Sequence, residues 1–156
     1  MGMKGRIAVM VVTLLFGLFG CAKKSDISVT SVEAMTLTLN GMRGSFVYEI
    51  ANEGDKTELR YYRKVYAQGE DILELEKSAV CDTQELIDLM NTCSIIKWDG
   101  FHGKHPKNVQ DGIMFVFSAD INGGQTVHAE GSANFPKKYN EFVRALNTIL
   151  SESEKN

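Results

Sequence analysis

The chain has 156 residues, with 17 Lys or Arg against 20 Asp or Glu and a net charge of −3 at pH 7. This length suffices for one domain with a buried core. Its two prolines and 14 glycines argue against disorder over most of the chain. The acidic balance argues against a nucleic-acid-binding protein, because gripping a phosphate backbone requires clustered positive charge.

The first 20 residues predict a secretion signal rather than a part of the fold. Lys4 and Arg6 form a basic start, and Ile7–Phe19 is an apolar stretch of 13 residues, shorter than the roughly 20 residues that span a bilayer. The sequence LFGC that ends this region resembles the lipobox of bacterial lipoprotein precursors, in which the cysteine, here Cys21, is acylated and the signal is cut before it. The alternative is an ordinary signal peptide followed by an accidental cysteine.

The lipobox resemblance implies a domain on the extracytoplasmic side of the cell envelope, held to a bacterial membrane lipid through acylated Cys21. Two or more acyl chains anchor stably, since each buried methylene contributes about 0.8 kcal/mol. Cleavage before Cys21 leaves 15 basic and 20 acidic side chains, a net charge of −5. Residues 21–31 are expected to form a polar tether, residues 32–151 a single globular domain and residues 152–156 a frayed tail.

Strand patterns open the predicted domain. Apolar and polar residues alternate in residues 33–40. The same alternation occurs in residues 44–67. The turn-forming sequence EGDK interrupts this alternation, and the pattern predicts a β-hairpin. Residues 72–80 predict a fourth, weaker strand with Leu73 and Leu75 on one side.

Residues 81–94 predict a helix. Asp82 is the expected N-cap, and Glu85 three residues later completes a capping box. Cys93 falls on the apolar stripe of this helix and is expected to be a small core residue. A helix of this length separates Cys81 from Cys93 by roughly 18 Å, whereas a disulfide requires Cα atoms within about 7 Å. Two free thiols are therefore expected.

Residues 113–132 predict a second hairpin, and parity predicts its register. The odd-numbered positions of both strands are apolar. The apolar face survives only if the three-residue loop Asn122–Gly124 joins the strands, with a glycine in the left-handed conformation. This register places Phe117 opposite Ala129.

The last predicted element is a helix that ends near residue 150. Ser132 or Asn134 is the expected cap, with Pro136 in the first turn. Its apolar stripe comprises Tyr139, Phe142, Val143, Leu146 and Leu150. The order of elements predicts an α+β fold, an antiparallel sheet of five or six strands with two helices packed on one face.

The segments WDGF, VQDG and AEGSANFP, the F-x-F strand and the following Y-x-x-F resemble a group of uncharacterised lipoproteins and domains of unknown function from anaerobic Gram-positive and gut bacteria. The resemblance covers about residues 44–150. It implies no functional residues, because the group has no assigned activity.

Residues 98–112, WDGFHGKHPKNVQDG, are the first candidate site. His102 and His105 are spaced H-x-x-H, and with His128 they could ligate a metal such as zinc. A small metal-dependent protein or enzyme built on these three histidines is the alternative function. The two Asp-Gly pairs instead favour a solvated connection of turns, anchored to the core by its aromatic residues.

The second candidate site is one face of the strand RYYRKVY, where Arg60, Tyr62, Lys64 and Tyr66 alternate with other residues. These side chains could stack on sugar rings or hold an anionic polymer, or they could form a ladder of cross-strand pairs. The sequence contains no nucleophile motif and no phosphate-binding glycine loop, and no cofactor is expected. It therefore predicts a non-catalytic domain that binds an envelope protein or polysaccharide.

Overall fold

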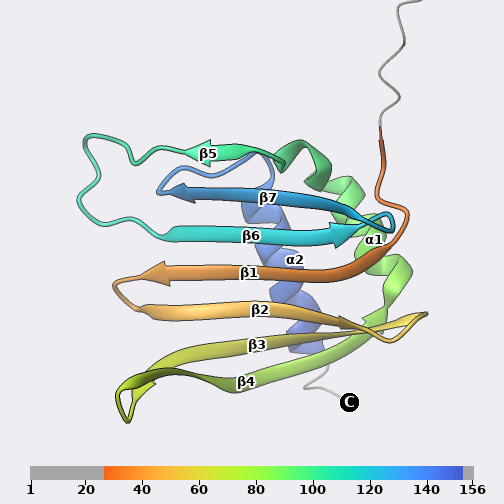
Figure 1. Cartoon of the computed structure of the whole chain (residues 1–156), viewed down its shortest axis with the longest axis horizontal. Coiled ribbons are helices and arrows are strands. Elements are labelled where there is room, and N and C mark those ends of the chain that lie inside the picture. The colour runs from red at the N-terminus through yellow and green to blue at the C-terminus, as the bar shows by residue number, and fades with distance from the viewer. Residues whose placement is uncertain (1–26, 153–156) are drawn as a thin grey trace, which may run out of the picture.

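Seven strands form one sheet in the order β4-β3-β2-β1-β6-β7-β5 in the computed structural model, which describes residues 27–152 (Figure 1). The strands are β1 Val32–Gly41, β2 Gly44–Asn52, β3 Lys56–Ala67, β4 Glu70–Asp82, β5 Phe101–Gly103, β6 Met114–Ile121 and β7 Gln125–Ser132. Helices α1 (Thr83–Thr92) and α2 (Tyr139–Glu152) lie against one face of the sheet, and a 3₁₀ helix, η1 (Ile95–Trp98), precedes β5. The predicted signal, Cys21 and residues 153–156 lie outside the described residues.

The prediction of a mixed α+β fold is confirmed, but the sheet has seven strands instead of five or six. The additional strand, β5, lies within residues 98–112, which were expected to be a connection. It pairs in parallel with β7, with Phe101 opposite Ala129, whereas the other pairings are antiparallel. A three-residue strand is too short to show alternation, and its partner lies far along the chain, so the sequence pattern carries no signal for it.

Residues 28–31, expected to belong to the tether, are attached to the domain. Val29 is buried, and the side chain of Asn91 bonds its backbone twice. Asn91 Oδ1 accepts from Val29 N at 2.8 Å, and Nδ2 donates to Val29 O at 2.9 Å. Asn122 Oδ1 accepts from Thr30 N at 2.7 Å. The segment looks like a tether because it is polar, but one apolar side chain and two distant asparagines bind it to the fold.

The hairpin of β6 and β7 has the predicted register. Phe117 lies opposite Ala129, and the three-residue loop Asn122–Gly124 joins the strands. The φ angles of the loop residues are 53°, 67° and 135°, a left-handed region that glycine enters without steric cost and asparagine tolerates. The apolar alternation of both strands is thus satisfied on one face, as parity required.

The core lies between the sheet and the two helices, and Trp98 is at its centre. The ring of Trp98 is 2% exposed, and its centroid lies 5.2 Å from that of Phe117 and 5.5 Å from that of Phe142. Its Nε1 donates to the carbonyl of Lys137 at 3.1 Å. The expectation that an aromatic residue anchors the start of the 98–112 segment is confirmed.

Both helices begin differently from the prediction. α1 follows Asp82, but the Asp82 carboxylate makes no capping hydrogen bond and instead pairs with Lys56 at 2.6 Å. The register of β3 with β4 places these two residues opposite each other, so the nearby ammonium group takes the carboxylate. Pro136 lies before α2, which begins at Tyr139, and the expected cap Ser132 ends β7.

Candidate functional site

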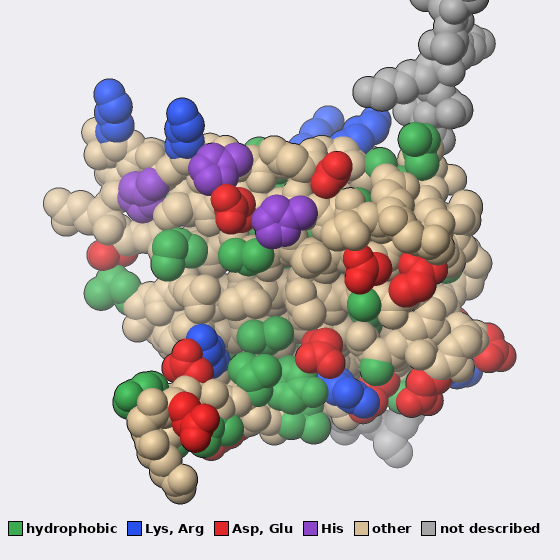
Figure 2. Space-filling model, in the orientation of Figure 1, with side chains coloured by type: hydrophobic (Ala, Val, Ile, Leu, Met, Phe, Trp, Pro, Cys, Tyr) green, Lys and Arg blue, Asp and Glu red, His purple; other side chains and the backbone are tan. Residues whose placement is uncertain are grey.

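The helices cover one face of the sheet and leave the other face open to solvent (Figures 1 and 2). Residues alternate between the two faces along each strand. On β1, Leu37 is fully buried beneath the helices, and Thr38 points the other way. On β6, Phe117 is buried and Val116 is 39% exposed. The side of the sheet that carries Thr38 and Val116 is called the open face.

An apolar row crosses the open face. The register of the strands places side by side one residue from each of β4, β3, β2, β1 and β6, which are Leu75, Tyr62, Val47, Thr38 and Val116. We call these five residues the central row. Leu75 and Val116 at the ends of the row are 56% and 39% exposed, Tyr62 and Thr38 are half-buried, and Val47 is buried. Figure 2 shows hydrophobic side chains gathering over the middle of this face.

Two exposed apolar side chains flank the central row. Leu73 of β4 and Met114 of β6 occupy the ends of the neighbouring row and are 46% and 52% exposed, and the polar residues Lys64, Ser45 and Asn40 lie between them. Contiguous apolar patches on an otherwise polar surface mark sites of interaction, whereas scattered exposed apolar residues do not. The central row and its neighbours therefore form the best candidate binding surface in the described residues.

Part of this surface could not be predicted from the sequence. Leu73 and Leu75 were predicted to share a side of their strand, but nothing indicated that Met114 and Val116 lie on the same face of one sheet. That alignment requires β1 to pair with β6, a pairing of segments far apart in the chain. A signal was present in the unbroken apolar run IMFVF, residues 113–117, because a strand apolar at both parities has two apolar faces.

The residues predicted as a ligand-binding face lie where the alternation of β3 placed them. Arg60, Tyr62 and Lys64 are half-buried on the open face, and Tyr62 belongs to the central row. Tyr66 lies near the turn between β3 and β4 and is 76% exposed. Of the four, Tyr62 is the one that contributes directly to the apolar row.

The positive charges of this face are paired. Arg60 bonds Glu58 at 2.5 Å and lies 4.0 Å from Glu49, and Lys64 bonds Asp71 at 2.6 Å. The contacts of Arg60 with Glu49 and of Lys64 with Asp71 cross between strands, as in the ladder of cross-strand pairs that was the alternative to a cationic patch, whereas Arg60 and Glu58 both belong to β3. Exposed pairs of this kind add little to stability, but they cancel the charge that an anionic polymer would recognise. The apolar row, rather than positive charge, distinguishes the open face.

His102 lies on β5, His128 on β7 and His105 in the connection after β5, and all three are at the edge of the open face (Figure 2). His102 Nδ1 donates to Glu130 Oε1 at 2.7 Å. His128 lies opposite Ser118, as the predicted register required, and its backbone N donates to Asp99 Oδ1 at 3.0 Å. Asp99 thus joins the start of β5 to β7.

His105 holds the connection between β5 and β6 in place. Its Nε2 donates to the carbonyl of Val109 at 2.5 Å, and its Nδ1 lies 2.8 Å from Ser132 Oγ. Binding a metal through His105 would break one of these bonds. Within residues 27–152, no three His, Cys, Asp or Glu side chains are grouped so that they could hold a metal ion. The geometry favours a structural role for this histidine.

Cys81 and Cys93 are free thiols at the two ends of α1, as predicted. Burial raises the pKa of both thiols above the ordinary value, and nearby carboxylates, Glu85 for Cys81 and Glu141 for Cys93, raise it further. Both groups therefore stay protonated near neutral pH. Since the thiolate is the reactive form, neither cysteine is a credible nucleophile.

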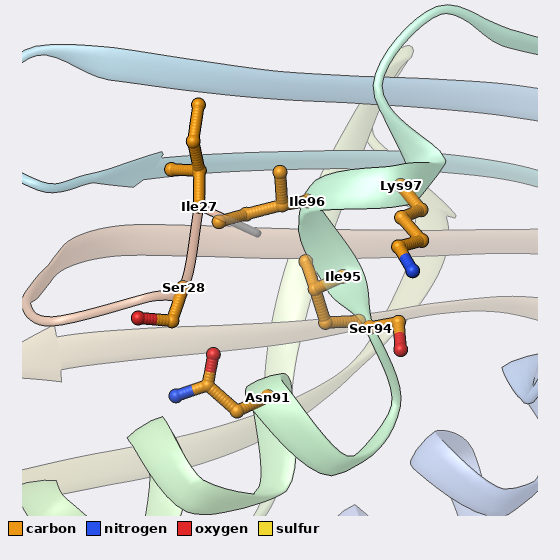
Figure 3. A pocket seen from close by; sticks show the side chains of 7 residues that line it. All are labelled: Ile27, Ser28, Asn91, Ser94, Ile95, Ile96 and Lys97. Atoms are coloured by element: carbon orange, nitrogen blue, oxygen red, sulfur yellow. The ribbon is translucent and has the colours of Figure 1, made fainter. Parts of the chain in front are cut away.

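A hollow of about 290 Å³ lies where the described chain begins, between residues 27–28 and the end of α1 with η1 (Figure 3). Its lining comprises Ile27, Ser28, Asn91, Ser94, Ile95, Ile96 and Lys97. The side chain of Ile96 extends toward Ile27 at its rim. The volume is just below the roughly 300–1,000 Å³ typical of small-molecule pockets. The hollow is therefore described as part of the surface around the point where the chain enters the domain.

No family model, curated protein or solved structure matches this chain. Neither α1 nor α2 is long and apolar enough to cross a membrane, and no other helix of the described residues is.

Proposed function

We propose that this chain is a membrane-anchored bacterial envelope lipoprotein whose domain binds another envelope component through the open face of its sheet. The observation that carries the proposal is the central row, a largely apolar band on the face that the two helices leave uncovered, with exposed Leu75 and Val116 at its ends. The ion pairs beside the row keep this face hydrated in the absence of a partner. Tyr62 in the row offers a ring that packs on either a protein or a sugar.

The anchor and the lack of catalysis rest on separate arguments. The resemblance of LFGC to a lipobox supports acylation of Cys21. The protonated thiols and the hydrogen-bonded histidines support a binding role rather than catalysis. The competing function, a metal-dependent protein using His102, His105 and His128, would require His105 to release one of its present hydrogen-bond partners, because both of its ring nitrogens are engaged.

Photo-crosslinking tests the open face. Placing p-benzoylphenylalanine at Val116 in the anchored protein, in its own cells, should give a discrete crosslinked product. Adding Leu75→Lys should reduce the yield several-fold, because a contact there would bury a charge without a partner. Digestion of the product with proteases or with glycosidases tells a protein partner from a polysaccharide.

The matched control places the same amino acid at Arg144, which is exposed on α2 on the opposite side of the sheet. This position should give little of the product. Equal yields at the two positions, or no product at Val116, would rule out the open face as the binding surface.

Metabolic labelling with an alkyne fatty acid tests the anchor. The parental protein should take up the label, and Cys21→Ala should abolish it, because the thiol is the expected site of acylation. Cys81→Ala serves as the control and should leave labelling unchanged. Persistent label on the Cys21→Ala protein, or none on the parental protein, would refute the lipobox interpretation.

A further inference from the structure

The chain enters the domain at the β5 edge of the sheet (Figure 1). The bonds from Asn91 and Asn122 to Val29 and Thr30 hold this entry in place. Cys21 lies six residues before Ile27, and a residue spans at most about 3.5 Å, so an acyl anchor on Cys21 lies within roughly 21 Å of Ile27. An anchored domain would therefore have its β5 edge close to the membrane.

Five exposed lysines gather at this same edge. They are Lys97 of η1, Lys104 and Lys107 of the connection after β5, and Lys137 and Lys138 before α2. We call these residues the basic edge. Three of them, Lys97, Lys137 and Lys138, line a single hollow, so segments distant in sequence lie side by side. Figure 2 shows basic side chains projecting beyond β5.

Some carboxylates also lie near the basic edge. Asp99 Oδ1 accepts from the backbone N of His128, and Glu130 Oε1 accepts from His102. None of the five lysines of the basic edge forms an ion pair with a carboxylate among residues 27–152. Lys138 Nζ donates to the carbonyl of Thr92, which is a neutral group. The ammonium charges of this edge are thus available to an external anion.

The opposite edge of the sheet carries no comparable positive charge. β4 has five carboxylates and one lysine in 13 residues, and three of the carboxylates, Asp71, Glu76 and Asp82, pair with cations of β3. An anionic surface would attract the basic edge rather than β4, and so would orient the domain as a short anchor at Cys21 does.

Two apolar side chains complete the surface around the chain entry. Ile27 is 58% exposed, and Ile96, which is partly buried against the core, extends toward it at the hollow of Figure 3; Lys97 follows Ile96 directly. Apolar residues flanked by lysine are typical of peripheral membrane contacts. The apolar side chains enter the interface, while the long lysine stems carry their ammonium groups to the phosphates.

We infer that the basic edge, with Ile27 and Ile96, is a membrane-contacting surface that binds anionic phospholipid headgroups. The orientation of the anchored domain rests on the proposed lipid anchor, whereas the affinity of the edge for lipid does not. In this arrangement the β5 edge of the sheet faces the membrane. The open face is then presented sideways to partners in the envelope, and β4 points away from the membrane.

Vesicle co-sedimentation tests the inference without the acyl chains. The protein is residues 21–156 with Cys21→Ser, which keeps the whole described fold. It should bind vesicles that contain phosphatidylglycerol at 0.1 M salt, bind pure phosphatidylcholine vesicles at least tenfold more weakly, and detach at 0.5 M salt, where charges are screened. Lys97→Glu/Lys104→Glu should weaken binding at least about 25-fold, since each lysine near an anionic membrane contributes roughly fivefold.

The matched control is Arg43→Glu/Arg144→Glu, which changes the net charge equally at exposed positions outside the basic edge. It should bind within about twofold of the parental protein. Lys97→Gln/Lys104→Gln replaces the double reversal if that variant fails to unfold cooperatively on heating. Equal binding to both kinds of vesicle, or equal loss in the control, would overturn the inference. Neither result would affect the fatty-acid labelling or the crosslinking that test the proposed function.

Discussion

Replacing Trp98 with alanine should lower the free energy of unfolding by about 3–5 kcal/mol, the usual loss for a large aromatic side chain deleted from a core. Trp98 packs against Phe117 of the sheet and Phe142 of α2, so the resulting cavity would lie where the sheet, η1 and α2 meet. The substitution also leaves the Lys137 carbonyl without its donor. Urea unfolding followed by circular dichroism measures the change.

Two further variants serve as comparisons for Trp98→Ala. Trp98→Phe keeps most of the ring packing but removes the Nε1 donor, and should cost less than the alanine substitution. Val116→Ala, at an exposed position of the open face, should change stability by no more than about 0.5 kcal/mol. A loss below about 1 kcal/mol for Trp98→Ala would contradict the central place assigned to this residue.

Gly131→Ala should destabilise the fold by about 1–3 kcal/mol, the range for overpacking a tight site. A Cβ at this position would clash with the carbonyl oxygen of Asn134 and approach Phe115 Cε1 to 2.8 Å. Gly131 pairs with Gly103 of β5, so relief of the clash should loosen β5. Thermal unfolding measures the loss, and limited proteolysis should show faster cleavage in residues 104–112.

Gly41→Ala is the control for this substitution. A Cβ there would meet its nearest neighbour, Ile113 Cγ1, at 3.4 Å, an ordinary contact, so stability should be unchanged or slightly raised. Comparable losses at Gly41 and Gly131 would show that the crowding at β5 is not the cause.

The proposed anchor, basic edge and central row describe one arrangement. The short link to Cys21 and the lysines would place the β5 edge at the membrane, and the apolar row then crosses a face that stands upright on it. A partner reaching the row would approach alongside the membrane. This geometry suits an accessory domain that holds another envelope component near the bilayer surface.

Only part of the candidate binding surface could be predicted from the sequence. Alternation along one strand is local, so the shared face of Arg60, Tyr62 and Lys64 followed from the sequence. The rest depended on long-range register. Thr38 meets Val116 only because β1 pairs with β6, and the charge of Lys64 is cancelled only because Asp71 lies within reach on β4. The periodicity of single segments carries no information about either contact.

Period-2 alternation, loop parity and the helical stripe were sufficient to predict an α+β domain, the register of Phe117 with Ala129 and two free thiols. These features depend on neighbours along the chain, where backbone geometry dictates which side chains share a face. The tertiary structure alone decided the seventh strand, the attachment of Val29 by Asn91, the use of Asp82 as a partner for Lys56, and the gathering of five lysines at one edge. Each of these depends on a contact between distant segments, whose partner is chosen by the packing of the whole sheet against its helices.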